Sequence, residues 1–110
     1  MANIRRYTTP TQELLVEGVD LTSAEVFVSY RQKNTSFVFS GNRIQVEAIT
    51  EDDRTDTLIS VYMTQEQTAS FKYNEDVEIQ VNWLEGHKRN ATVIVRCKVS
   101  DNLLEEVINL

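Results

Sequence analysis

Two side chains in the sequence have the chemistry of a nucleophile and its general base: the only cysteine, Cys97, and the only histidine, His87. A Cys-His pair is nucleophilic when the imidazole takes the thiol proton, so the two groups must lie within hydrogen-bonding reach. His87 follows Gly86 in a charged stretch that is typical of a solvated turn. Cys97 alternates with valines, which predicts a buried and inert thiol. The sequence therefore predicts no enzyme, and a single cysteine forms no internal disulfide.

Carboxylates gather between Glu51 and Asp56, where four acidic residues fall within six positions. Calcium takes clustered oxygen ligands, so it is the metal that this group would suit. The segment lacks the Asp-x-Asp-x-Asp-Gly spacing of an EF-hand, and Arg54 competes for the carboxylates. We therefore predict a solvated acidic loop and no metal. The sequence also has no glycine-rich phosphate loop and no Gly-x-Ser-x-Gly elbow, so we predict no catalytic residues and no cofactor.

The charge balance narrows the choice of partners. The 110 residues carry 17 Asp and Glu against 11 Lys and Arg, for a formal net charge of −6. Binding to nucleic acid or to an anionic membrane needs clustered basic residues, so we expect neither as a partner. The basic start of the sequence has no apolar stretch after it, which argues against a signal peptide.

The elements that would position these groups are strands. Apolar and polar residues alternate with a period of two, and the apolar ones are mostly β-branched or aromatic, which favours strands over helices. Hairpin turns are predicted at Lys33-Asn34, Ser40-Gly41-Asn42 and Glu85-Gly86-His87. We predict an all-β fold, an antiparallel two-sheet β-sandwich of about six to eight strands. The expected strands are residues 12–17, 25–32, 35–40, 43–49, 57–63, 76–84 and 88–99.

Three segments depart from this alternation within a chain that we predict to be a single domain over residues 1–110. The sequence Thr64-Gln65-Glu66-Gln67 matches a capping box and predicts one helical turn near residues 65–70. Residues 1–10 are expected to form an extended arm. Residues 102–110 carry apolar residues at helical spacing, which predicts a short C-terminal helix.

Several short motifs occur in an order that resembles a known group of proteins. They are Thr-Pro-Thr at 9–11, Gly-Val-Asp-Leu-Thr at 18–22, Tyr-Arg-Gln at 30–32, Met-Thr-Gln-Glu-Gln-Thr at 63–68, Ile-Gln-Val-Asn-Trp at 79–83 and the terminal stretch 99–108. The order resembles small structural proteins of bacteriophages and prophages of Firmicutes. The opening strands are more loosely similar to the N-terminal β-sandwich domain of phage baseplate upper proteins. The resemblance implies a structural or assembly protein of the virion, made in the host bacterial cytoplasm, and leaves head, tail and baseplate positions open.

The candidate site of such a protein is an interface with other proteins. The predicted C-terminal helix either packs on its own sandwich or docks on a neighbouring subunit. Phe27 would face outward if Val26 and Val28 face inward. We expect contacts with other virion proteins, with copies of the chain itself, or with both, giving a homo-oligomer in the assembled particle. The candidate interface residues are Leu103, Leu104, Val107, Ile108, Leu110 and Phe27.

The alternative function is a carbohydrate-binding or adhesin-type module. Tyr62, Phe71, Tyr73 and Trp83 lie close together in the sequence and could form a platform for a sugar ring. Trp83 continues the apolar face of its strand, which favours a place in the core. Tyr62 falls opposite its apolar neighbours, which favours an outward ring.

Overall fold

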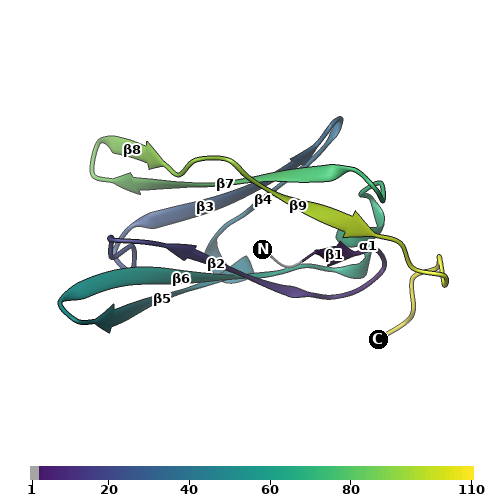
Figure 1. The fold of residues 1–110 in the computed structure, drawn as a ribbon, viewed down its shortest axis with the longest axis horizontal. Coiled ribbons are helices and arrows are strands. Elements are labelled where there is room, and N and C mark those ends of the chain that lie inside the picture. Colours follow the sequence, from purple (N-terminus) through teal and green to yellow (C-terminus); the bar gives the residue numbers. More distant parts are fainter. Residues whose placement is uncertain (1–2) are drawn as a thin grey trace.

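The computed structural model describes residues 3–110, which form two β-sheets packed face to face (Figure 1). One sheet has the strand order β1-β9-β7-β3-β4, with β8 paired to β7, and the other has the order β2-β6-β5. All pairs are antiparallel except the short β1–β9 pair. The predicted all-β sandwich is therefore confirmed. The elements are β1 (Ile4–Arg5), β2 (Thr11–Val16), β3 (Glu25–Gln32), β4 (Thr35–Phe39), the 3-10 turn η1 (Gly41–Arg43), β5 (Ile44–Glu51), β6 (Arg54–Tyr62), α1 (Gln65–Ala69), β7 (Asp76–Glu85), β8 (Lys88–Ala91) and β9 (Val95–Ser100).

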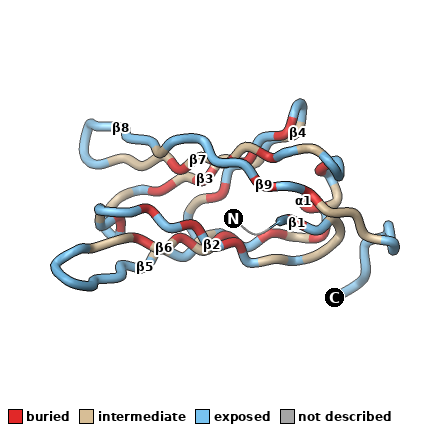
Figure 2. The backbone as a smooth tube through the Cα atoms, viewed as in Figure 1, coloured by how far each residue is buried: buried red, intermediate tan, exposed pale blue. Residues whose placement is uncertain are grey.

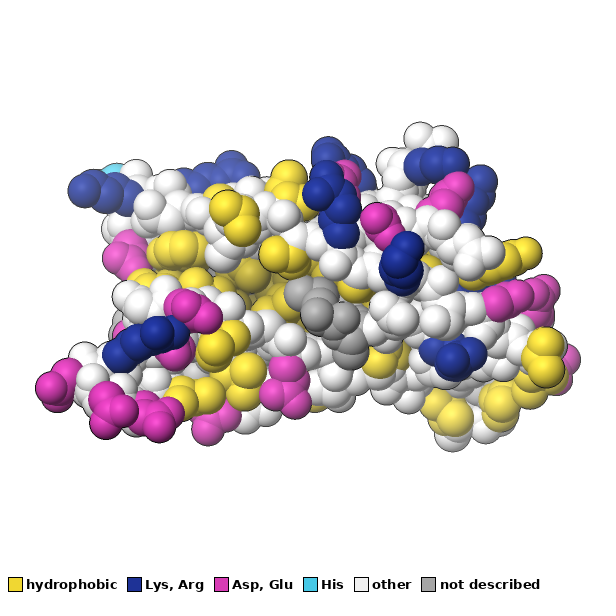
Figure 3. Space-filling view, viewed as in Figure 1, with side chains coloured by type: hydrophobic (Ala, Val, Ile, Leu, Met, Phe, Trp, Pro, Cys, Tyr) yellow, Lys and Arg dark blue, Asp and Glu magenta, His cyan; other side chains and the backbone are white. Residues whose placement is uncertain are grey.

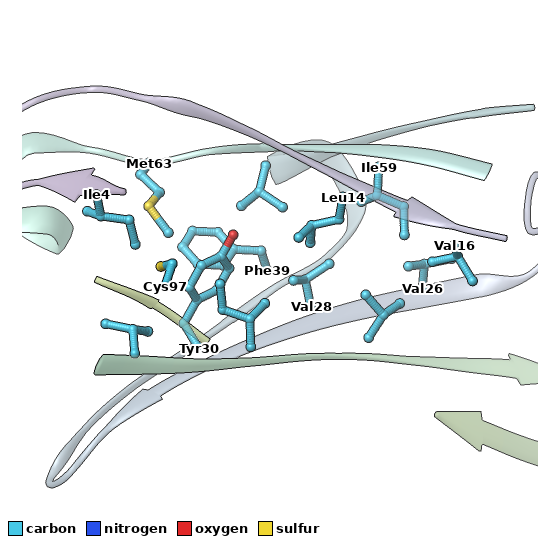
Figure 4. Packing of buried hydrophobic residues seen from close by; sticks show 14 of the residues in the cluster. Ile4, Leu14, Val16, Val26, Val28, Tyr30, Phe39, Ile59, Met63 and Cys97 are labelled. Carbon is cyan, nitrogen blue, oxygen red and sulfur yellow. The ribbon is translucent and has the colours of Figure 1, made fainter. Parts of the chain in front are cut away.

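The core lies between the sheets, and the alternation of the strands fills it (Figure 2). Tyr30 is fully buried, and its ring meets Phe39 edge to face with centroids 5.3 Å apart. Its hydroxyl points from β3 across the core (Figure 4) and donates to Gln12 Oε1 on the opposite sheet at 2.6 Å. Gln12 Nε2 also donates to Cys97 Sγ of the six-stranded sheet at 3.8 Å, so the two sheets are joined by apolar packing and by buried polar contacts of Gln12.

The acidic stretch that we predicted as a loop is mostly strand. Glu51 ends β5, Arg54 begins β6, and the two are directly paired, so only Asp52 and Asp53 form the turn. Both turn residues have positive φ, 48° and 64°, as a two-residue type I′ hairpin requires. Carboxylates at outward positions of paired strands do not interrupt pairing, and the prediction was wrong because it treated charge as a sign of a loop.

The connection after β4 is not the predicted hairpin. β4 belongs to the six-stranded sheet and β5 to the three-stranded one, so the chain crosses between the sheets through η1. Phe39 is buried at the end of β4, and Ile44 and Val46 pack against the same core from the other side. The crossing therefore lets consecutive strands cover opposite sides of one core.

A β-bulge divides the predicted strand 88–99 into β8 and β9. Between the pairs Asn82↔Ala91 and Ile79↔Val95, three residues of this strand face two residues of β7. The Thr92 hydroxyl accepts from Val81 N–H at 3.1 Å, and Thr92 N–H donates to the Val81 carbonyl at 2.9 Å. The extra residue leaves Val93 79% exposed, although its alternation with Val95 predicted a core position.

The two ends of the chain also differ from expectation. Ile4 is fully buried and β1 pairs with β9, so the described part of residues 1–10 is integrated in the sandwich and is no extended arm. Residues 1–2 lie outside the described residues. The predicted helix over residues 102–110 is wrong, since this segment has no helical structure. A nine-residue helix is unstable unless it buries its apolar face, and no such face is buried here. The capping box at Thr64 is confirmed by its two reciprocal hydrogen bonds to Gln67.

Candidate interaction surfaces

The C-terminal segment, residues 102–110, exposes the five apolar residues that were predicted as an interface. Leu103 is fully exposed, Leu110 is 90% exposed, and Leu104, Val107 and Ile108 are each about half exposed. Packing of this stripe on its own sandwich, one of the two alternatives, is therefore not observed. Exposed apolar side chains gathered on one segment are typical of a surface that meets another protein.

The backbone of this segment is nevertheless held in place by Gln65. Its side-chain Nε2 donates to the Ile108 carbonyl at 2.8 Å, and its Oε1 accepts from Ile108 N–H at 2.9 Å. Gln65 is the first residue of α1 and is 6% exposed, so its amide is fixed by the helix and its capping box. The side-chain amide of Gln65 thus pairs with the backbone of Ile108 as a neighbouring strand would, while the apolar side chains of the segment are exposed to solvent.

Arg6 provides a second anchor for the same segment. Its guanidinium lies 3.1 Å from Asp101 Oδ1 and 3.7 Å from Glu105 Oε1, and it donates to the Ala69 carbonyl at 3.1 Å. The Asn102 side chain donates to the Arg6 carbonyl at 3.2 Å. The arginine side chain is 16% exposed, so these contacts are more than a surface ion pair. The start of the chain, α1 and the C-terminal segment therefore form one unit at this end of the sandwich.

Phe27 lies on a different surface, the outward side of the six-stranded sheet, which we call the six-stranded face. It is half-buried and borders a depression of about 370 Å³ together with Val38, Leu84 and Arg89. A second depression of about 280 Å³ lies next to it, bordered by Val38 and by Ile94 from the bulge. The six predicted interface residues therefore fall on two separate surfaces.

The outward side of β2, β6 and β5, the three-stranded face, is acidic and was not predicted as a site. Residues 11–17 and 44–62 contain seven acidic residues and one basic residue, which equals the net charge of −6 of the whole chain. The remaining residues therefore carry equal numbers of acidic and basic groups. Figure 3 shows acidic side chains gathered over the β5–β6 hairpin and basic ones over the opposite sheet. The acidic positions are Glu13, Glu17, Glu47, Glu51, Asp52, Asp53 and Asp56.

The groups that could act as nucleophile and base are not brought together. Cys97 is buried opposite Val77 near the start of β7, whereas His87 is exposed in the turn beyond the end of β7. The length of β7 between them is roughly 25 Å. Burial raises the pKa of the Cys97 thiol, which opposes formation of the thiolate. Among the described residues no group of three or more His, Cys, Asp or Glu side chains could hold a metal ion.

The aromatic residues do not form one platform either. Trp83 is half-buried and packs against the core from β7. Tyr62 is 39% exposed on the three-stranded face, where its hydroxyl donates to Gln45 Oε1 at 2.8 Å. Phe71 is buried and meets Phe37 edge to face at 5.6 Å. Tyr73 is 48% exposed and, like Phe71, lies in the connection between α1 and β7, so the four rings differ in depth and in the part of the fold that carries them.

Comparisons with protein-family models and with characterised proteins find no match for this chain. In residues 3–110 there is no helix with the length and apolar character needed to cross a membrane.

Proposed function

We propose that this chain is a non-enzymatic structural or assembly protein of a bacteriophage virion that acts through protein–protein contacts. The observation that carries the proposal is the C-terminal segment, whose backbone is anchored while its five apolar side chains stay exposed. A segment fixed in this way is ordered before it binds, which lowers the entropy lost when it meets a partner. The resemblance of the sequence motifs to small phage proteins supports the virion as the place of those contacts.

The contacts would repeat over many copies in a particle. Five apolar side chains bury too little surface for a tight isolated complex, since stable complexes bury about 800 Å² per partner. Copies held next to one another in a particle bind with an increased effective concentration, so weak individual contacts are sufficient. A place as capsid decoration or head-associated protein and a place in the tail or baseplate are both compatible with this mechanism.

Incorporation into particles tests the proposal. The double variant Leu103→Asp/Leu110→Asp changes the two most exposed residues of the segment. The control is Val93→Asp, which changes an apolar residue of similar exposure, 79%, outside the segment. Neither change removes buried apolar contacts, so both proteins should keep wild-type unfolding midpoints.

Quantitative mass spectrometry of purified particles gives the readout. We expect the wild type and Val93→Asp at equal copy number, and the double variant reduced at least tenfold. Normal incorporation of the double variant, or absence of the wild-type chain from the particles of the phage that encodes it, would contradict the proposal.

A further inference from the structure

The two outer faces of the sandwich differ in shape. On the three-stranded face, Leu15 and Leu58 are directly paired across β2 and β6, and Ile49 on β5 lies two residues beyond Glu47, the partner of Leu58. Leu15 is 51% and Ile49 is 40% exposed and Leu58 is half-buried, so the three residues form a row of apolar side chains on this face, which we call the apolar ridge. The six-stranded face is hollowed instead, because both of its depressions share the small residue Ser29 and the edge residue Val38.

Both depressions have apolar borders that match the ridge. Phe27 and Leu84 border one of them, and Ile94 borders the other. Val38, which lies between the two, is 64% exposed. A ridge of leucine and isoleucine side chains can therefore enter these depressions and remove apolar surface from water on both sides.

The charges of the two faces are complementary. The outward positions of β2, β6 and β5 carry acidic residues, with Arg54 as their single base. The outward positions of the six-stranded sheet have an excess of two positive charges, with the basic residues Arg5, Arg31, Arg89, Arg96 and Lys98 against the acidic residues Glu25, Asp76 and Glu78.

The basic residues of the six-stranded face are not all neutralised by their own sheet. Glu78 is shared by Arg31 and Arg96, at 2.9 and 3.2 Å. Arg89 makes no salt bridge among residues 3–110, and its Nε donates to Asn82 Oδ1 at 3.1 Å. A carboxylate from another molecule can therefore approach Arg89, whereas two three-stranded faces would repel each other.

We propose that the three-stranded face of one copy docks on the six-stranded face of a second copy. This inference deepens the proposed function, on which it rests, by naming a second copy of the chain as a partner. The faces lie on opposite sides of the sandwich, so the contact is head-to-tail and each added copy leaves one face available. The two sheets are stacked along the 26 Å axis of the molecule (Figure 1), so each face extends over about 46 by 22 Å, which provides room for an interface of the size of stable complexes.

Self-association of the purified full chain tests this inference. We expect light scattering and sedimentation to give masses above the 12.7 kDa of the monomer. The mass should rise with protein concentration and fall when NaCl is raised from about 0.05 to about 0.5 M, because salt screens the charges. The variant Glu13→Lys/Glu47→Lys reduces the net charge of the three-stranded face from −6 to −2, and Arg89→Glu/Lys98→Glu turns the basic excess of the six-stranded face into an acidic one. Each should weaken association at least tenfold.

Mixing the two variants is the decisive step. In the mixture the unchanged six-stranded face of the first variant meets the unchanged three-stranded face of the second, so pairs of unlike variants should form at equal amounts although neither variant associates alone. The control Glu66→Lys/Glu85→Lys makes the same change of net charge as Glu13→Lys/Glu47→Lys at exposed residues outside both faces and outside the C-terminal segment, and it should associate as the wild type does.

Three results would overturn the inference: a wild type that stays monomeric, face variants that associate normally, or a mixture that does not recover. A monomeric wild type whose incorporation into particles depends on Leu103 and Leu110 would overturn this inference and leave the proposed function standing. Loss of association in the control would also overturn the inference, because it would show that net charge and not the two faces governs association.

Discussion

The buried hydrogen bond between Tyr30 and Gln12 allows a sharp test of how the two sheets are held together. Tyr30 is fully buried, Gln12 is 3% exposed, and the hydroxyl lies 2.6 Å from Gln12 Oε1. The substitution Tyr30→Phe removes one oxygen and keeps the ring against Phe39. A net hydrogen bond contributes about 1 kcal/mol, and a buried polar group deprived of a partner costs about 1–3 kcal/mol. We expect Tyr30→Phe to lower the free energy of unfolding by about 2 kcal/mol.

The chain offers a matched control in Tyr62→Phe. The Tyr62 hydroxyl also donates to a glutamine, Gln45, at 2.8 Å, but that pair lies at the surface. Water can replace this hydrogen bond, so the loss should stay below about 0.5 kcal/mol. Urea unfolding followed by the fluorescence of the single tryptophan, Trp83, measures both values. Equal losses for the two variants would refute the view that burial gives the Tyr30–Gln12 contact its strength.

Further predictions concern pH, the C-terminal segment and the acidic turn. Burial, and secondarily Cys97, raises the pKa of Tyr30 above its usual value near 10, so its contribution to stability is complete below pH 10 and is lost as pH rises toward the folded pKa. The wild type should therefore lose about 1.4 kcal/mol per pH unit more than Tyr30→Phe in urea titrations above pH 10, and parallel curves would contradict this. Gln65→Ala removes both hydrogen bonds to Ile108, so hydrogen exchange of the Ile108 amide should become at least tenfold faster. Unchanged exchange would show that the Arg6 contacts alone hold the segment. Asp53→Gly removes the backbone strain of a non-glycine residue at φ 64°, so it should raise the free energy of unfolding by about 0.5–1 kcal/mol. Thermal unfolding measures this change, and a lower melting temperature for the variant would contradict the prediction.

The sequence predicted those parts of the fold that depend on local pattern. Period-two alternation identified the inward residues of β3 and β7, such as Val28, Tyr30 and Ile79, because one side of each strand faces the core and the other side faces outward. The capping box at Thr64 could also be predicted from the sequence, since its two hydrogen bonds join residues that are three positions apart.

The sequence predictions were wrong where the local pattern fits two structures equally well and contacts between residues far apart in the sequence decide between them. Val93 and Val95 are the same residue type, and only the register with β7 shows that one of them lies in a bulge. The apolar spacing at residues 103–108 fits a helix as well as an anchored irregular segment, and Gln65, more than 40 positions away, decides between them. The choice of sheet for β5 likewise depends on pairing with β6.

The candidate surfaces were predictable in part. The apolar residues of the C-terminal segment stood out by composition, and the structure exposes them. The three-stranded face was missed, although its signal was present: Glu13 and Leu15, and likewise Glu47 and Ile49, occupy alternate positions of their strands. Strand pairing brings these positions together on one face, and pairing partners were not available from a single sequence.

The central claim is that the exposed apolar C-terminal segment binds protein in the assembled particle. Hydrogen exchange of this segment, measured in the purified chain and in intact particles, tests the claim most directly. We expect the amides of residues 103–110 to exchange at least tenfold more slowly in particles than in the purified chain. Equal exchange in both states, with the chain present in the particles, would contradict it.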